Sequence, residues 1–262
     1  MGDPTVPDSD VGASAEPDQD PDPVLRRVSD LVADRNRART ARPVVVGIGG
    51  PVCVGKSTYS AALAERLRGQ GGLVTIVVAG DGFLWPNAVL AERGILERKG
   101  FPESYDLLGA SGFLDAVRSG DRDVVAPRYS HEDYDVVEGS EPVGAVDVVI
   151  FEGVVVLQET FGPRLDLGVY LHAEADLLRQ WFVDRFVELV AGLDEGSTSV
   201  LGLFRGLDET GLRQAAVGVW ESYNVPNNRD HIEPMRDGAD IVVEPGPSHE
   251  ILQWHQPRRP RP

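Results

Sequence analysis

Cysteine, lysine and long apolar runs are all scarce in this sequence. The 262 residues include one cysteine, Cys53, which excludes a disulfide within the chain. No apolar run approaches the roughly 18 residues that a membrane-spanning helix needs. The first residues, MGDPTVPDSD, lack the basic and then apolar order of a secretory signal. These absences predict a cytoplasmic protein without a membrane partner.

Positive charge is also in short supply. Lysine and arginine together number 25, against 42 aspartates and glutamates, which gives a net charge of −17. This balance argues against nucleic acid or an anionic membrane as a partner and favours a small molecule. Nearly all of the basic residues are arginines, because Lys56 and Lys99 are the only lysines.

Composition divides the chain into three parts. Residues 1–22 hold seven acidic residues and four prolines, and no basic or large aromatic residue. Because such a segment cannot bury enough apolar surface to offset its ordering entropy, a disordered acidic tail is expected. One folded domain is expected over 23–254, followed by a loose basic tail over 255–262.

Alternating strand and helix patterns predict an α/β fold. Apolar residues at helical spacing extend from Pro23 to about Arg37, ahead of the buried strand VVVGIG. The expected strands span 44–49, 73–79, 146–151, 167–173 and 241–243, the last at an edge, and further helices are expected over 57–68, 175–193 and 209–223. The strand runs are continuously apolar, which is typical of a mostly parallel sheet with helices on both faces.

The stretch GPVCVGKST joins the first strand to the helix over 57–68. Gly50, Gly55, Lys56 and Ser57 match the pattern G-x-x-x-x-G-K-[ST] of a phosphate loop. Glycines let successive backbone N–H groups point at phosphate oxygens, and the following helix adds the positive end of its dipole. A glycine-rich turn without a ligand is the alternative, but it gives no reason for the lysine and the serine. The predicted ATP-binding residues of this P-loop are Gly50, Pro51, Val52, Cys53, Val54, Gly55, Lys56, Ser57 and Thr58.

Within this loop, three side chains have individual expectations. Lys56 is expected to reach the β- and γ-phosphates, and the Ser57 hydroxyl is expected to ligate Mg²⁺. Cys53 is either a small apolar filler or a thiol whose modification blocks nucleotide binding.

Several classes of phosphate-loop protein are excluded. Neither lysine follows an asparagine, so the guanine signature N-K-x-D is absent, as is the L-S-G-G-Q element of transporter ATPases. A small-molecule kinase remains, and it needs a carboxylate near the γ-phosphate to accept the proton of a substrate hydroxyl. Asp81 and Glu152 end predicted strands at the edge where ligands bind, whereas Asp147 begins a strand and is expected at the far edge. The alternatives are a turn aspartate and a strand-end glutamate without such roles.

Longer blocks carry a family resemblance. DGFLWPNAVLAERGILERKGFPESYD (81–106) and APRYSHEDYD (126–135), together with GPVCVGKST, FEGVVVLQ and LLRQWFVDRF, resemble the bacterial type I pantothenate kinases from about Pro43 to Gln253. The resemblance implies a single P-loop kinase domain with a helical lid, similar in fold to phosphoribulokinases and uridine kinases. It also implies MgATP-dependent phosphorylation of the primary hydroxyl of pantothenate to 4′-phosphopantothenate, the first step of coenzyme A biosynthesis.

The same resemblance implies roles at the reacting end of the site. Asp81 would be the catalytic acidic residue, with its carboxylate facing the substrate hydroxyl. Lys56 would hold phosphate, and Ser57 with Glu152 would hold the metal. Arg185 would clamp phosphate from the lid, although its residue type alone also fits a solvated helix face.

Other matched positions concern the two substrates. Tyr129, His131, Phe182 and Asn227 would line the pantothenate site, and His249 would lie near the adenine ring. From the residues alone, the first two fit an aromatic hairpin, Asn227 a turn beside a proline, and His249 an exposed tail histidine.

Departures from the family pattern lie on the pantothenate side. Phe182 stands where the family has tyrosine, Val155 replaces an asparagine, and Val200 with Leu201 replaces a tyrosine–phenylalanine pair. Loss of a polar partner for a buried substrate group costs about 1 to 3 kcal/mol. Two alternatives therefore stay open: a kinase of the same fold for another small alcohol, such as a pantothenate analogue, nucleoside or sugar, and an inactive nucleotide-binding regulator. The family also implies a homodimer and feedback by coenzyme A. Both expectations stay open, because the region before the P-loop is shorter than in the family.

Overall fold

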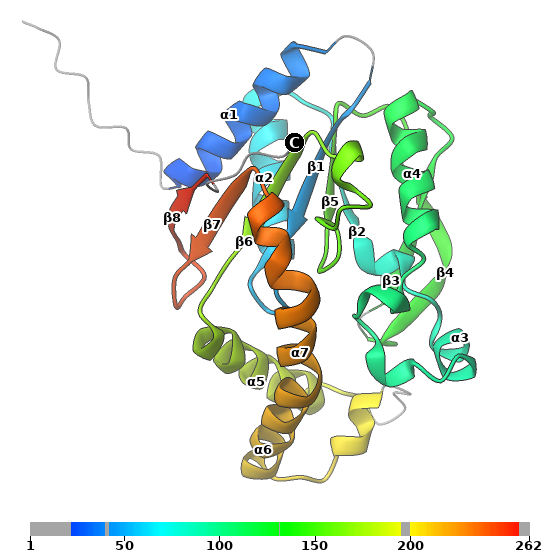
Figure 1. Ribbon diagram of the computed structural model, residues 1–262, viewed down its shortest axis with the longest axis vertical. Coiled ribbons are helices and arrows are strands. Elements are labelled where there is room, and N and C mark those ends of the chain that lie inside the picture. The colour runs from blue at the N-terminus through cyan, green and yellow to red at the C-terminus, as the bar shows by residue number, and fades with distance from the viewer. Residues whose placement is uncertain (1–21, 40–41, 131, 195–199, 257–262) are drawn as a thin grey trace, which may run out of the picture.

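The predicted α/β architecture is confirmed. The computed structural model describes residues 22–39, 42–130, 132–194 and 200–256 (Figure 1). The strands are β1 (Val44–Gly49), β2 (Thr75–Ala79), β3 (Val125–Ser130), β4 (Asp135–Pro142), β5 (Val148–Glu152), β6 (Leu167–Leu171), β7 (Ile241–Pro245) and β8 (Ile251–His255). The helices are α1 (Pro23–Arg37), α2 (Lys56–Gly71), α3 (Asn87–Glu92), α4 (Leu107–Ser119), α5 (Ala175–Ala191), α6 (Glu209–Val219) and α7 (Val225–Asn227).

A six-stranded sheet has the order β2-β5-β1-β6-β7-β8. The first five strands are parallel, and β8 pairs antiparallel with β7. The prediction of an edge strand over 241–243 was therefore wrong, because β8 covers β7. The residues of β8, ILQWH, are mostly half-exposed or exposed, so they lack the continuous apolar run that marks the inner strands. The remaining two strands, β3 and β4, form a separate hairpin.

Both faces of the sheet are buried, which explains the continuous apolar runs. In β1, Val44, Val46 and Ile48 belong to the core cluster that includes α1 and α2, whereas Val45 belongs to the cluster that includes α4. Figure 1 shows the same division, with α4 and the β3–β4 hairpin on one side of the sheet and α1 on the other. Each inner strand therefore needs apolar residues at successive positions.

Aspartate side chains cap the amino ends of helices α1 and α4. Asp22 accepts from the backbone N–H of Leu25 at 2.7 Å, and Pro23 occupies the first turn of α1. Asp106 caps α4 in the same way through the N–H of Gly109 at 2.9 Å. No helix in the described ranges is long and apolar enough to cross a membrane.

Helices α5 and α6 form a body of their own below the sheet in Figure 1. A separate apolar cluster holds them together, and its buried members are Val183, Phe186, Val190, Leu212 and Ala216. Beyond α6, the chain continues through two π-helical turns, Trp220–Asn224 and Asn228–Ile232, on either side of α7. Pro226 lies between the two turns and has no N–H to donate to the turn before it.

Candidate active site

Three strand ends meet at one edge of the sheet. Glu152, the last residue of β5, pairs with Ile48 of β1 on one side and with Ala79 of β2 on the other. The P-loop begins two residues after Ile48, and Asp81 lies two residues after Ala79. This register brings the loop, Glu152 and Asp81 together, although they are far apart in the sequence.

The P-loop curls back over the end of β1. At Gly50, φ is 144°, and a Cβ atom would lie 2.4 Å from the carbonyl oxygen of Leu171, so only glycine fits. The loop then enters α2, whose first residue is Lys56. The Lys56 ammonium donates to the carbonyl oxygen of Pro51 at 2.8 Å, which folds the side chain back across the loop.

Lys56, Ser57 and Glu152 form a compact polar group. The Ser57 hydroxyl donates to Glu152 Oε1 at 3.0 Å. Burial lowers the pKa of Lys56 from its usual value, and the carboxylates of Glu152 and Asp81 oppose that shift. Burial raises the pKa of Glu152, which is only 8% exposed, while Lys56 opposes this shift. Each buried charge therefore depends on the other for compensation.

Asp81 sits in a short 3-10 turn that touches the β3–β4 hairpin. At Gly82, a Cβ atom would lie 2.5 Å from the carbonyl oxygen of Pro127, so this glycine allows the hairpin to approach the turn. The Tyr105 hydroxyl donates to Asp81 Oδ1 at 3.0 Å. No expectation from the sequence included Tyr105, although it lies in the KGFPESYD block that carried the resemblance.

Lys99 is a second residue that the sequence reasoning missed. Its ammonium donates to Asn87 Oδ1 at 2.6 Å and to the carbonyl oxygen of Tyr134, and it lies over the Tyr129 and Tyr134 rings. Burial lowers the pKa of Lys99 to about 8, with Asp135 and Asp81 opposing the shift. The signal in the sequence was the scarcity of lysine. The chain has only two lysines, and both carry charge beside Asp81.

The aromatic residues of the hairpin lie close to Lys99 and to Asp81. The Tyr129 and Tyr134 rings lie 6.4 Å apart in a T-shaped arrangement, and Tyr134 has φ of 54°. Burial raises the pKa of both phenols, and Asp81 contributes to each shift. His131 lies outside the described residues.

Helix α5 and the turn between β7 and β8 meet beside the P-loop. The Trp181 and His249 rings stack at 3.9 Å, and Trp181 Nε1 donates to the carbonyl oxygen of Pro247 at 3.0 Å. His249 Nε2 lies 3.1 Å from the carbonyl oxygen of Cys53. Arg185 is exposed on α5, and its charge acts on both Cys53 and Lys56. Trp181 was not predicted as part of the site.

Asn227, the last residue of α7, is a buried polar side chain between the two π-helical turns. Asn227 Nδ2 donates to the carbonyl oxygen of Gly100 at 2.9 Å, next to Lys99. Its Oδ1 atom is buried, and none of the described residues donates to it. A buried acceptor without a donor is costly and points to a polar ligand or water. Phe182 is half-buried, with its ring 5.4 Å from Trp220.

Comparison with curated proteins identifies the family. The chain is 40% identical over 243 residues to a pantothenate kinase from Sorangium cellulosum, covering 88% of this chain and 77% of that protein. The chain belongs to the pantothenate kinase family. Pantothenate kinases from Sinorhizobium medicae and Brucella ovis are 38% and 37% identical, over 80% of this chain and 67% and 69% of those proteins. No protein-family model matches the chain.

Solved structures place this pantothenate kinase family member among P-loop kinases. A protein from Silicibacter sp. TM1040 that is described as a fructose transport system kinase is 28% identical, with a TM-score of 0.69, over 84% of this chain and 98% of that one. D-glycerate 3-kinase from Cryptococcus neoformans shares the fold, with a TM-score of 0.63 at 17% identity, over 88% of this chain and 98% of that one. The predicted P-loop kinase fold is thereby confirmed.

The departures from the pantothenate kinase pattern fall in different environments. Val155 is only 3% exposed and belongs to the apolar core, so its side chain packs inside the protein. Val200 is exposed, and Leu201 packs against the α5–α6 cluster. Phe182 packs against both the α5–α6 cluster and the core cluster that includes α1 and α2, so it lies where the two clusters meet.

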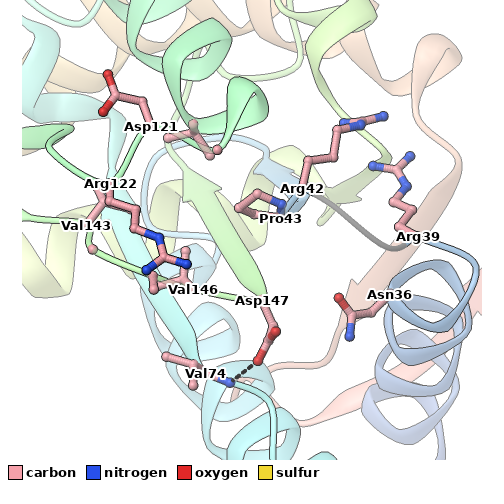
Figure 2. A pocket seen from close by; sticks show the side chains of 14 residues that line it. Asn36, Arg39, Arg42, Pro43, Val74, Asp121, Arg122, Val143, Val146 and Asp147 are labelled. Carbon is pink, nitrogen blue, oxygen red and sulfur yellow. Dashed lines mark hydrogen bonds between the residues drawn. The ribbon is translucent and has the colours of Figure 1, made fainter.

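A cavity of about 350 Å³ lies at the opposite edge of the sheet (Figure 2). Asp147 lines it and accepts from the backbone N–H of Val74 at 2.8 Å, so this aspartate lies at the far edge, as predicted. Arg39 and Arg42 also line the cavity, but their guanidinium groups contact the Asp166 carboxylate at 2.5 and 3.5 Å. These pairs belong to the structural frame and are remote from the P-loop.

Cys53 provides a chemical test of access to the P-loop. Burial raises the pKa of its thiol, with Arg185 and Lys56 opposing the shift, so alkylation should be slow at pH 7 and faster as the pH rises. We expect a bulky thiol reagent to block MgATP binding, and MgATP to protect the thiol. Mass spectrometry of the modified peptide, paired with a binding assay, measures both effects. Full activity after complete alkylation would contradict this expectation.

Proposed function

We propose that this chain is a pantothenate kinase, which transfers the γ-phosphoryl group of ATP to the primary hydroxyl of pantothenate in the first step of coenzyme A biosynthesis. Its membership of the pantothenate kinase family supports the activity. The observation that carries the proposal is the convergence of Lys56, Ser57, Glu152 and Asp81 at one sheet edge. A site that had lost phosphotransfer would have no need to keep all four.

The P-loop is proposed to hold the phosphate groups. Its backbone N–H groups and the amino end of α2 would face the phosphate oxygens. Lys56 would exchange its contact with Pro51 for a phosphate oxygen, which is a better partner for an ammonium than a carbonyl oxygen is. Arg185 would add a second positive charge from α5, and His249 would lie against the nucleotide base.

Ser57 and Glu152 are proposed to hold Mg²⁺. Their oxygens lie 3.0 Å apart, and a hydroxyl beside a carboxylate suits a hard cation that also keeps water and phosphate ligands. The raised pKa of Glu152 fits the same role, because a carboxylate destabilised by burial gains from a neighbouring cation. MgATP, when bound, supplies the phosphoryl group and neutralises part of its charge.

Asp81 is proposed as the general base. Its carboxylate would accept the hydroxyl proton as the substrate oxygen bonds to the γ-phosphorus and the bridging oxygen departs with ADP. Tyr129 and Lys99 border the space beside Asp81, and Lys99 would attract a carboxylate-bearing substrate. The unpaired Oδ1 of Asn227 would accept from an amide N–H such as that of pantothenate.

A second candidate is a kinase for another small alcohol. Phe182 cannot offer the hydroxyl that the family pattern has there, and a 28% identical structural neighbour is described as a fructose transport system kinase. ADP release measured across pantothenate, its analogues, nucleosides and sugars separates the two candidates. Pantothenate should give the highest kcat/KM, and no turnover above the water control with pantothenate would overturn the proposal.

The Phe182→Tyr variant tests the altered pocket directly. A restored hydroxyl is expected to lower the KM for pantothenate about two- to tenfold, the range of one added hydrogen bond, while the KM for ATP stays unchanged. Steady-state kinetics on the Phe182→Tyr variant and on the original chain give the comparison. An unchanged KM for pantothenate would show that this departure does not affect substrate binding.

Several expectations stay predictions beside this proposal. They are the cytoplasmic location, the homodimer, feedback by coenzyme A, and the division into an acidic tail, one kinase domain and a basic tail. Thermal shifts with pantothenate, coenzyme A and ATP test the ligand part, because a ligand at about 100 times its dissociation constant adds nearly 3 kcal/mol to the free energy of unfolding.

A further inference from the structure

We infer that Tyr105 is a positioning residue for phosphotransfer, holding Oδ1 of Asp81 so that Oδ2 is left to accept the proton of the substrate hydroxyl. The inference rests on the proposed function, because it assigns Asp81 the role of base. Its basis is the hydrogen bond of 3.0 Å from the Tyr105 hydroxyl to Asp81 Oδ1. No other described residue donates a hydrogen bond to this carboxylate, so Tyr105 is its one fixed partner within the described chain.

The backbone around both residues is held in register. Leu84 and Tyr105 form an antiparallel bridge, and the flanking hydrogen bonds join Trp85 N to Ser104 O at 2.9 Å and Asp106 N to Phe83 O at 2.7 Å. The turn that carries Asp81 is therefore paired directly with the segment that carries Tyr105. Their side chains meet because of this pairing.

Tyr105 is also anchored from its own side. The Ser104 hydroxyl accepts from Gly100 N at 2.9 Å and donates to the carbonyl oxygen of Phe101 at 2.7 Å, which closes the turn before Tyr105. Asp106, the next residue, caps α4. Tyr105 itself is 5% exposed, so its ring has little freedom to move. A rigid donor of this kind fixes the orientation of the carboxylate that it contacts.

The phenol stays a donor throughout the useful pH range. Burial and the nearby Asp81 carboxylate raise the pKa of Tyr105 well above its usual value. A neutral phenol can donate one hydrogen bond, and an ionised carboxylate can only accept. With one oxygen of Asp81 occupied, the free acceptor sites lie on the other oxygen, which is the arrangement that a general base needs.

The Tyr105→Phe variant keeps the ring and removes the hydroxyl. We expect kcat to fall about 10- to 100-fold, the scale of a misaligned catalytic group, with the KM for ATP within about twofold of the original. The matched control is Tyr59→Phe in α2, because Tyr59 is also 5% exposed and its hydroxyl has no hydrogen-bond partner among the described residues. That control should leave kcat unchanged. All assays are run well below the measured melting midpoints, so that loss of folded protein does not enter kcat.

A double-mutant cycle separates positioning from a structural role. If Tyr105 acts through Asp81, Tyr105→Phe should lower turnover by less than about twofold in an Asp81→Asn background. Equal losses in both backgrounds, or an unchanged kcat in the single variant, would overturn the inference. The original chain is assayed first with the alcohol panel. Absence of pantothenate turnover there would count against the proposed substrate, whereas the cycle can be measured with whichever alcohol is phosphorylated.

Discussion

Replacing Asp81 with asparagine is expected to lower kcat about 100-fold or more, the usual scale for removing a general base. Asparagine keeps the shape of the side chain and can still accept from Tyr105, but it cannot take up the substrate proton. The affinity for MgATP should be nearly unchanged, because the proposed phosphate ligands lie in the P-loop. Steady-state kinetics and calorimetric titration of MgATP measure the two quantities separately.

Asp147→Asn is the matched control for this prediction. Asp147 lies at the opposite edge of the sheet, and among the described residues its carboxylate accepts from one backbone N–H, which an amide oxygen can also do. This variant should keep its turnover. Near-normal turnover in Asp81→Asn would assign the proton transfer to another group.

The Lys56→Met variant is expected to weaken MgATP binding and to lower turnover about 100-fold or more, as for loss of a preorganised electrostatic contact. Methionine has a similar length but carries no charge for the phosphates. Lys56 also lowers the pKa of Glu152, so its removal should raise that pKa further. As the pH falls, Glu152 would then become protonated earlier in the variant than in the original chain. The residual activity of the variant should therefore be lost at a higher pH than the activity of the original chain.

The other lysine gives an informative comparison. Lys99→Met should leave the MgATP affinity within about twofold, because Lys99 contacts Asn87 and the hairpin rather than the P-loop. Its effect should appear in the KM for pantothenate. Equal losses of MgATP affinity in both variants would contradict the assignment of the phosphates to Lys56.

Strand ends and the P-loop were predictable from the sequence because their signals are local. A continuous β-branched run ending in Asp81 or Glu152 places each acid at the sheet edge without knowledge of its neighbours. The contact between Tyr105 and Asp81 is different. It depends on a bridge between two irregular segments, 83–85 and 104–106, and no periodic pattern marks either of them. Lys99 was missed for the same reason.

Two further features show where pattern reading fails. The short strand β8 has neither a continuous apolar run nor strict alternation, so it was not expected, and β7 was wrongly placed at the edge. The π-helical turns on either side of Asn227 have no periodic signature of their own, so the helix predicted over 209–223 stopped short of this residue, and the residue type of Asn227 fitted a turn beside Pro226.

The insertion of β5 between β1 and β2 separates the P-loop from the turn that carries Asp81. Neighbouring strands lie about 4.8 Å apart, so the P-loop strand and the Asp81 strand are separated by roughly 10 Å. Direct pairing of β1 with β2 would halve that gap. In the proposed function, this strand order would keep the nucleotide and the acceptor alcohol at separate strand ends, with Glu152 between them.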